Sequence, residues 1–422
     1  MRKSAKKKVA REEGTMVLHL AEVIRRDLHA FVVEAGMTAL SLILEREREA
    51  ACGPRYEHRR DRAARRAGFA AGELVMGGRR VGVRRPRART MDGSEVVLPS
   101  WSHFSAEDPL QRRAVEQMLI GVSTRRYGRS LEAVPEGFRT RGTSRSAVSR
   151  RFVEATESQM KEWLARDLRG IDLAAIMIDG VHVEDHVLLI ALGIDTVGVK
   201  HVLGVREGAT ENATSCKELL ADLSCRGIRT NRTILAVIDG SKALSKAIRA
   251  VFGRRALIQR CQAHKVRNVE DQLPEKMRPS VRMAMRQAYR CGDVERAKRL
   301  LSNLVRSLRA DHPGAAGSLE EGLDETLTVM RLGLPEWLER TLVTTNAIEN
   351  LIGSVRALGR RVRRWRDGQM ILRWTTAAII DAATRFRKLR GHGGMRTLVA
   401  ALRAHDAAIK SKQAVESVSP AA

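Results

Sequence analysis

Aromatic residues, cysteines and long apolar runs are all scarce in this sequence, and each scarcity excludes a class of protein. Phe, Trp and Tyr make up 4% of the 422 residues, so stacking of bases on aromatic side chains is not expected as the main mode of ligand contact. Five cysteines without a secretion signal predict reduced thiols and not a disulfide framework. The longest apolar stretch, residues 187–194, is far shorter than the ~20 residues that span a membrane.

Several catalytic motifs are also missing. The sequence has no P-loop, HExxH, GxSxG or GxGxxG in a fitting context, so nothing supports ATP coupling, zinc hydrolysis, acyl transfer or dinucleotide chemistry. The basic N-terminus leads into a charged stretch, residues 9–13, and not into the apolar segment of a signal peptide. We therefore expect a cytoplasmic protein.

Positive charge is abundant. The chain has 76 Lys and Arg against 49 Asp and Glu, which gives a net charge of +27. Because this excess is spread along the chain, it predicts a polyanionic partner and an extended electrostatic footprint. Double-stranded DNA is the expected partner, since the alternative, a membrane, lacks a spanning segment.

The N-terminal part of the sequence has features of a DNA-binding region. Apolar residues at helical spacing over residues 17–49, interrupted by Gly36, predict a packed helix. A short hairpin is predicted from residues 73–76 and 80–83, around a Gly-Gly pair and beside many arginines. At one domain per roughly 100–200 residues, two to four domains are expected, and we assign residues 1–100 to a basic N-terminal DNA-binding region.

Residues 101–170 are predicted to form a helical region with a helix-turn-helix. Within it, residues 142–153 are typical of the second helix of that motif: Ser or Thr caps the start, and Val148, Phe152 and Val153 supply a packing face. Base or backbone contacts with DNA are expected from Arg145, Arg150 and Arg151.

From residue 174 the apolar period changes to that of strands. Runs at 174–178, 186–192, 199–205, 234–238 and 256–259 predict five strands, with helices over 212–225 and 242–252. A three-stranded meander followed by alternating helix and strand gives an α/β fold with a mixed five-stranded sheet and flanking helices, which resembles the ribonuclease H-like fold. We assign residues 171–264 to the first part of this core, 265–340 to an all-helical insertion, 341–390 to its second part and 391–422 to a flexible tail.

Three carboxylates stand out against this framework. Asp179 and Asp239 each follow five small or β-branched apolar residues and precede Gly, which predicts strand ends that open into turns. A single Asp-Gly after an apolar run is more often a turn than a metal ligand, but two of them in one sheet favour a shared site. Glu349 lies on a later helix, with Asn346 on the same face. The three acids together predict a site for two Mg²⁺ ions, with Mn²⁺ as a substitute, that performs phosphoryl transfer.

Several residues near the acids are predicted to assist. Cys261 and His264 have metal-ligand spacing, but a zinc site needs four ligands and no second pair follows. We therefore expect Cys261 to pack in the core and His264 to form a hydrogen bond near the acids or the phosphate. His182, Arg267 and Asn268 are expected at the DNA backbone.

An arginine cluster at residues 360–366 follows Glu349 closely. It is expected to continue the helix of Glu349 and to hold the DNA strand being cut, chiefly through Arg361, Arg363 and Arg364. Trp365, in the middle of the cluster, is expected to pack against the sheet.

Four segments together resemble the IS256 family of bacterial insertion-sequence transposases, relatives of the Mutator-like elements. They are residues 191–212, 260–268 (RCQAHKVRN), 344–350 (TTNAIEN) and 361–368 (RVRRWRDG). The resemblance implies that Asp179, Asp239 and Glu349 form the DDE triad of the family, with Cys261 and His264 as its Cys-x-x-His element. Many members have Ala and an aromatic residue where this chain has Gly180 and His182.

The resemblance also implies an activity: Mg²⁺-dependent cleavage and strand transfer at terminal inverted repeats, by a nucleoid-associated homodimer. Two alternatives remain open. A structure-specific nuclease on the same fold would not need so large a DNA-binding N-terminus. A non-catalytic helix-turn-helix regulator would leave the three acids without a role.

Overall fold

The computed structural model describes residues 28–56, 62–76, 79–106, 111–119, 121–130, 140–142, 144–208, 213–360, 362 and 364–418. The chain divides into two compact units, residues 1–156 and 157–422. No helix within the described ranges combines the length and the apolar character needed to cross a membrane.

The first unit is built on a long helix and a three-stranded sheet. Helix α2 (Leu28–Cys52) packs on β1 (Ala64–Met76) and β2 (Arg79–Thr90), which pair antiparallel, while β3 (Thr140–Gly142) pairs with β2. The predicted hairpin is therefore confirmed, with strands longer than the sequence indicated. The predicted helix is confirmed from residue 28 onward, and it continues through Gly36 without interruption because Val33, Met37 and Leu40 bury one continuous face.

Short helices complete this unit. They are α3 (Pro99–Ala106), α4 (Gln111–Leu119) and α5 (Tyr127–Ser130), followed by α6 (Arg145–Ala165), whose last residues belong to the second unit. At the start of α6, the Ala147 N–H donates to Ser144 Oγ at 3.2 Å. Val148 and Phe152 are buried, so the capping and the packing face expected for this helix are confirmed.

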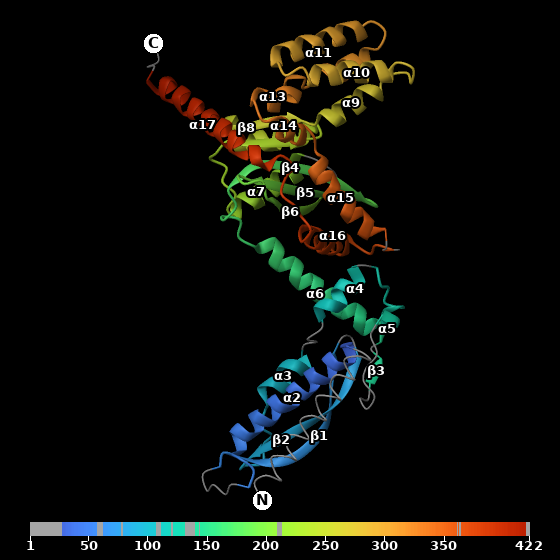
Figure 1. Cartoon of the computed structure of the whole chain (residues 1–422), viewed down its shortest axis with the longest axis vertical. Helices are drawn as coiled ribbons and strands as arrows, with labels where there is room; N and C mark the ends of the chain where they lie inside the picture. Colours follow the sequence, from blue (N-terminus) through green and yellow to red (C-terminus); the bar gives the residue numbers. More distant parts are fainter. Residues whose placement is uncertain are drawn as a thin grey trace, which may run out of the picture. The chain divides into compact units, whose positions relative to one another are not determined.

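The second unit contains a mixed five-stranded sheet (Figure 1). Its strands are β4 (Leu173–Val183), β5 (His186–Asp195), β6 (Lys200–Gly208), β7 (Ile234–Ile238) and β8 (Ala256–Arg260), in the order β6-β5-β4-β7-β8. The first three form an antiparallel meander, and β7 and β8 run parallel to β4. This confirms the predicted α/β architecture and is consistent with a ribonuclease H-like core.

Helices cover both faces of this sheet. Alternate residues of a strand point to opposite faces: Ile176 and Ile178 pack with α7 (Ala213–Cys225) and α8 (Lys242–Phe252). Ala175 and Met177 pack on the other face with α15 (Asn346–Gly359), α16 (Gly368–Ala383) and α17 (Met395–Val418). We call this second face the α15 face.

Helices also fill the chain between β8 and α15 (yellow to orange in Figure 1). They are α9 (Gln262–Glu270), α10 (Arg278–Tyr289), α11 (Val294–Leu308), α12 (Pro313–Glu320), η2 (Asp324–Leu327), α13 (Thr328–Arg331) and α14 (Glu336–Leu342). The first of these helices have a hydrophobic core of their own, with Leu301 and Val305 at its centre.

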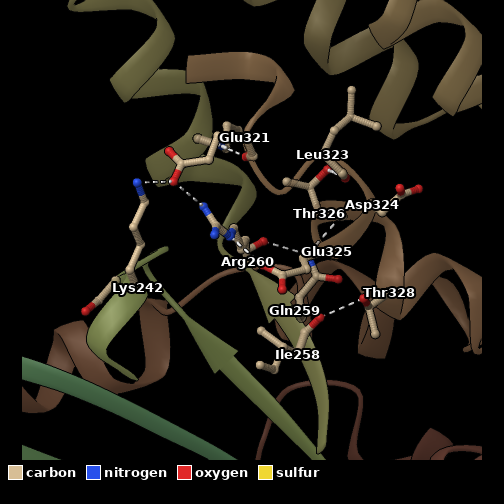
Figure 2. A network of polar contacts seen from close by, with 12 residues as sticks. Lys242, Ile258, Gln259, Arg260, Glu321, Leu323, Asp324, Glu325, Thr326 and Thr328 are labelled. Atoms are coloured by element: carbon tan, nitrogen blue, oxygen red, sulfur yellow. Dashed lines mark hydrogen bonds and ion pairs between the residues drawn. The ribbon is translucent and has the colours of Figure 1, made fainter. Parts of the chain in front are cut away.

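A polar network joins this helical segment to strand β8 (Figure 2). The buried Arg260 donates through Nε to Glu325 Oε2 at 2.6 Å. The buried Gln259 donates through Nε2 to the Thr326 carbonyl at 2.9 Å and accepts the Val329 N–H at 2.8 Å. These bonds fix the returning chain against the edge of the sheet, close to where β8 ends.

Two expectations from the sequence are wrong. Asp179 does not end its strand, because β4 continues to Val183: Val181 is buried and pairs with Leu188 of β5. The segment 391–422 is not a flexible tail over most of its length. Residues 395–418 form α17, which buries Leu398 and Leu402 on the α15 face, and Asp406 accepts the Thr233 N–H at 2.9 Å.

Candidate active site

The strand register brings Asp179 and Asp239 together. Residues 175 to 177 of β4 lie opposite 235 to 237 of β7, so the same register places Asp239 opposite Asp179. Neighbouring strands are ~4.8 Å apart. Met177 and Val237 point to the α15 face. Asp179 and Asp239 each come two residues later, so they are expected to point to the same face. This register therefore puts the two half-buried aspartates at neighbouring positions, just past the last paired residues of β4 and β7.

Backbone groups orient both carboxylates. Asp179 Oδ1 accepts the N–H of Gly180 at 2.8 Å, and Asp239 Oδ1 accepts the N–H of Ser241 at 2.9 Å. Between the latter two residues, Gly240 has a φ of +115°, which favours glycine. Ser241 then caps α8 by accepting the Leu244 N–H at 3.3 Å. The Asp-Gly-Ser sequence thus builds a tight strand-to-helix turn that fixes one aspartate.

Strand β8 adds Cys261 to the same edge. Ile238 lies opposite Arg260 in the parallel β7–β8 pair, so Cys261 follows next to Asp239. The Cys261 N–H donates to the Ile238 carbonyl at 2.7 Å. Cys261 is fully buried, as expected for a core residue.

Glu349 lies in the first turn of α15, held by the buried Thr345 before it. Thr345 Oγ1 donates to Glu349 Oε1 at 2.5 Å and lies 3.3 Å from His264 Nδ1 and 3.4 Å from Cys261 Sγ. His264 Nδ1 is 3.8 Å from Glu349 Oε1. Apolar residues of α15, including Ile348, pack on the face that carries the aspartates. His264 thus lies within hydrogen-bond distance of Thr345, beside Glu349. The contact of Thr345 with Glu349 is not predicted from the sequence, although Thr is a preferred residue before a helix.

The titration of His264 and Cys261 reflects this cluster. The hydrogen bond to Cys261 raises the pKa of His264; burial opposes this, and the negative charges of Glu349 and Asp239 support it. Burial raises the pKa of the Cys261 thiol, but hydrogen bonds from His264 and Thr345 outweigh burial and lower it. The contribution of Asp239 to the pKa of His264 links the aspartate edge to the Glu349 cluster.

The cluster also raises the question of which metal these residues suit. Within the described ranges, one group has ligand atoms close enough to share an ion: those of Cys261, His264 and Glu349 lie within 4.8 Å of one another. This group does not include the two aspartates. Zn²⁺ accepts Cys and His ligands, while Mg²⁺ takes oxygen ligands. The carboxylates of Asp179, Asp239 and Glu349 fit Mg²⁺ by the chemistry of their donors.

The other predicted residues are mostly exposed. His182 is exposed and lines a groove of about 230 Å³ with residues from the end of α15. Asn346, the first residue of α15, is exposed. Arg267 and Asn268 are exposed on α9. In the first unit, Arg145 and Arg150 are exposed on α6, and Arg151 is half-buried.

The arginine cluster does not continue the helix of Glu349, so that expectation is wrong. Helix α15 ends at Gly359, and residues 362 and 364–367, which the structure describes between it and α16, are not helical. At the start of α16, Asp367 Oδ1 accepts the Met370 N–H at 2.7 Å. Trp365 packs partly buried on the α15 face, as predicted, which turns the connection back onto the core. Arg364 is exposed, and Arg361 and Arg363 lie outside the described residues.

Comparisons with known proteins agree on one family. A family model described as "Transposase, Mutator family" matches residues 11–388. The chain is 27% identical over 356 residues to the transposase for insertion sequence element ISRM5 of Rhizobium meliloti (strain 1021), which covers 82% of this chain and 86% of that protein. It is 25% identical over 355 residues to the transposase for IS256 in transposon Tn4001 of Staphylococcus aureus, with coverage of 82% and 88%. For the transposase of IS6120 of Mycolicibacterium smegmatis, identity is 30% over 221 residues, with coverage of 51% and 67%.

Proposed function

Since this chain belongs to the Mutator family of transposases, we propose that it is a DDE transposase that binds the terminal inverted repeats of an insertion sequence and catalyses Mg²⁺-dependent DNA cleavage and strand transfer. One observation carries the proposal: the β4–β7 register, continued two residues past its last pair, sets Asp239 opposite Asp179, and the helix of Glu349 packs on the same face. The relatives, named as transposases for insertion sequence elements, support the class of substrate.

The three acids would hold the metal in this proposal. Two Mg²⁺ ions bound there would supply activation of the attacking oxygen, first of water and then of the freed 3′-OH, and stabilisation of the leaving 3′ oxygen. The protein orients the ligands: backbone N–H groups fix Asp179 and Asp239, and the Thr345 hydroxyl fixes Oε1 of Glu349. The hydrogen bond to Cys261 raises the pKa of His264, and its Nδ1 lies 3.8 Å from Glu349 Oε1, a position that would suit donation to a phosphate oxygen.

The remaining parts of the chain have proposed roles in DNA binding. The sheet and its helices would form a ribonuclease H-like core that residues 265–340 interrupt as a helical insertion. Residues 1–100 and 101–170 would grip the inverted repeats, with exposed arginines of α6 at the DNA. The transposase would act as a homodimer at the bacterial nucleoid.

Conservative substitutions of the acids test the proposal. Asp179→Asn, Asp239→Asn and Glu349→Gln each keep the shape of the side chain but remove a negative metal ligand, so we expect loss of cleavage and joining with DNA binding retained. Asp185→Asn, in the exposed turn after β4, is the matched control and is expected to stay active. Full cleavage by Glu349→Gln would contradict the assignment of this residue.

The same assays separate the alternatives. Cleavage without joining by the wild-type protein would favour a nuclease. Sequence-specific binding with no cleavage under any divalent metal would favour a regulator.

A further inference from the structure

A second, arginine-lined groove lies beside the acid-bearing edge. It has a volume of about 530 Å³ and is lined by residues of α9, α10 and α14. Arg282, Arg286 and Arg290 follow one another at intervals of four, which places them along one side of α10 and its C-terminal end. Arg267 of α9 and Arg340 of α14 complete the set.

Most of this positive charge is not neutralised within the protein. Arg282 pairs with Glu270 through Nε and Oε1 at 2.5 Å, and Arg340 pairs with Glu336 at 2.5 Å. Among the residues that the structure describes, no acidic partner is found for the remaining arginines of the groove, Arg267, Arg286 and Arg290. Each of these guanidinium groups presents N–H donors in a fork that matches a phosphate.

Two other polar side chains belong to the lining. The Thr344 hydroxyl is shielded from solvent and has no hydrogen-bond partner in the described part of the chain. Glu339 and Glu270 are the two carboxylates in the groove lining. Burial and, to a lesser extent, the negative charge of Glu336 raise the pKa of Glu339. The groove lining thus holds five arginines against two carboxylates, a surplus of cationic donors that suits an anionic ligand.

Residues that line the groove are direct sequence neighbours of residues in the candidate active site. Gln262 directly follows Cys261, and Thr344 directly precedes Thr345, which holds Glu349. The Gln262 N–H donates to the Val343 carbonyl at 2.9 Å, so these two segments lie side by side. A DNA strand whose reacting phosphate lies at the acids can therefore extend into this groove.

We propose that this groove binds the sugar–phosphate backbone of a single DNA strand next to the reacting phosphate. The inference rests on the proposed function, because it takes the acids as the position of that phosphate. The volume of about 530 Å³ lies within the roughly 300–1,000 Å³ of small-ligand sites, which suits a short length of single strand and not a duplex.

A salt titration of DNA binding by the full-length protein tests this, in EDTA so that no strand is cut. Two random-sequence DNAs are compared: a blunt duplex, and the same duplex with a single-stranded arm. The groove variant is Arg286→Gln with Arg290→Gln. The matched control is Arg296→Gln with Arg299→Gln, two exposed arginines of α11 in the same helical segment but outside the groove.

For the groove variant, we expect the log–log salt slope on the armed DNA to fall by about 1.4, since each single-strand phosphate contact contributes about 0.7. The slope on the blunt duplex should stay unchanged, and Lys at both positions should restore most of the loss. An equal loss on both DNAs, or an equal loss in the control variant, would overturn the proposal. Thermal melting of each variant shows whether it is folded.

Activity assays distinguish which strand the groove holds. If the groove variant loses only cleavage, the groove holds the strand that flanks the element. If it loses only the joining of pre-cut ends, the groove holds the target strand. A wild-type protein that binds DNA but never cleaves it would refute the proposed function and leave the binding comparison intact, so the two failures are distinguishable.

Discussion

Replacing Thr345 with Val removes the hydroxyl that holds Glu349 and little else. Thr345 is fully buried, and Val keeps its branched shape, so the packing between β8 and α15 is retained. The variant loses the donor to Glu349 Oε1 at 2.5 Å and the polar neighbour of His264 Nδ1 at 3.3 Å. We expect the Glu349 carboxylate to sample orientations that do not suit metal binding.

The size of the effect follows from the lost hydrogen bond. A bond to a charged group contributes about 1.5–3 kcal/mol. The Glu349 side chain is 38% exposed, so water replaces part of the lost bond and the lower end of that range applies. About 1.4 kcal/mol corresponds to a factor of ten in rate. We therefore expect the free energy of unfolding to fall by about 1.5 kcal/mol, and strand cleavage to slow about tenfold because the same bond orients a proposed metal ligand.

Single-turnover cleavage at saturating Mg²⁺ measures this effect, with Thr376→Val as the control. Thr376 is also fully buried, but its hydroxyl donates to the Leu372 carbonyl within α16 at 2.8 Å. The control should lose comparable stability and keep its cleavage rate. Wild-type cleavage by Thr345→Val, or equal slowing in both variants, would refute the role given to Thr345.

Three further predictions concern other parts of the molecule. Arg260→Met should lower the free energy of unfolding, measured by urea titration, by about 2–3 kcal/mol. This loss is smaller than the ~3–5 kcal/mol expected when a buried charge loses its partner, because Glu325 keeps an ion pair with Arg249 at 2.7 Å. An unchanged urea midpoint would contradict the network of Figure 2. Burial lowers the pKa of Lys265 to about 8. In the unfolded chain this lysine keeps its proton up to a pH of about 10.4. The wild type should therefore gain stability relative to Lys265→Met as the pH rises from about 8 to 10. Parallel stability profiles of the two proteins over this pH range would contradict the lowered pKa of Lys265. Arg145→Ala should weaken binding to the element's ends more than to random DNA if α6 reads bases, and equal losses in a mobility-shift assay would make it a backbone contact.

The sheet could be predicted from the sequence because its strands are buried on both faces and read as continuous apolar runs. β7 and α8 have the predicted bounds, since Asp239, Gly240 and Ser241 mark the turn between them. The tail was misjudged because Leu398 and Leu402 are spaced among Ala and charged residues. Their burial depends on the α15 face, which is formed by distant segments.

The candidate site was only partly predictable for a similar reason. The apolar runs before the two Asp-Gly pairs predict strands, and this places Asp179 and Asp239 at one sheet, although only Asp239 follows the end of its strand. The cluster around Glu349 depends on Thr345 meeting Cys261 and His264, which lie more than 80 residues earlier in the chain. No local sequence pattern predicts this contact, because it forms only when the whole helical segment between β8 and α15 brings the chain back to the sheet.

The position of the bound metal tests the central claim most directly. Crystals of the full-length protein with DNA, soaked in Mn²⁺, would reveal the ion by its anomalous scattering. We predict density between Asp179 and Asp239, with Glu349 completing the site. Density only at Cys261 and His264, or none at the aspartate edge, would contradict the account.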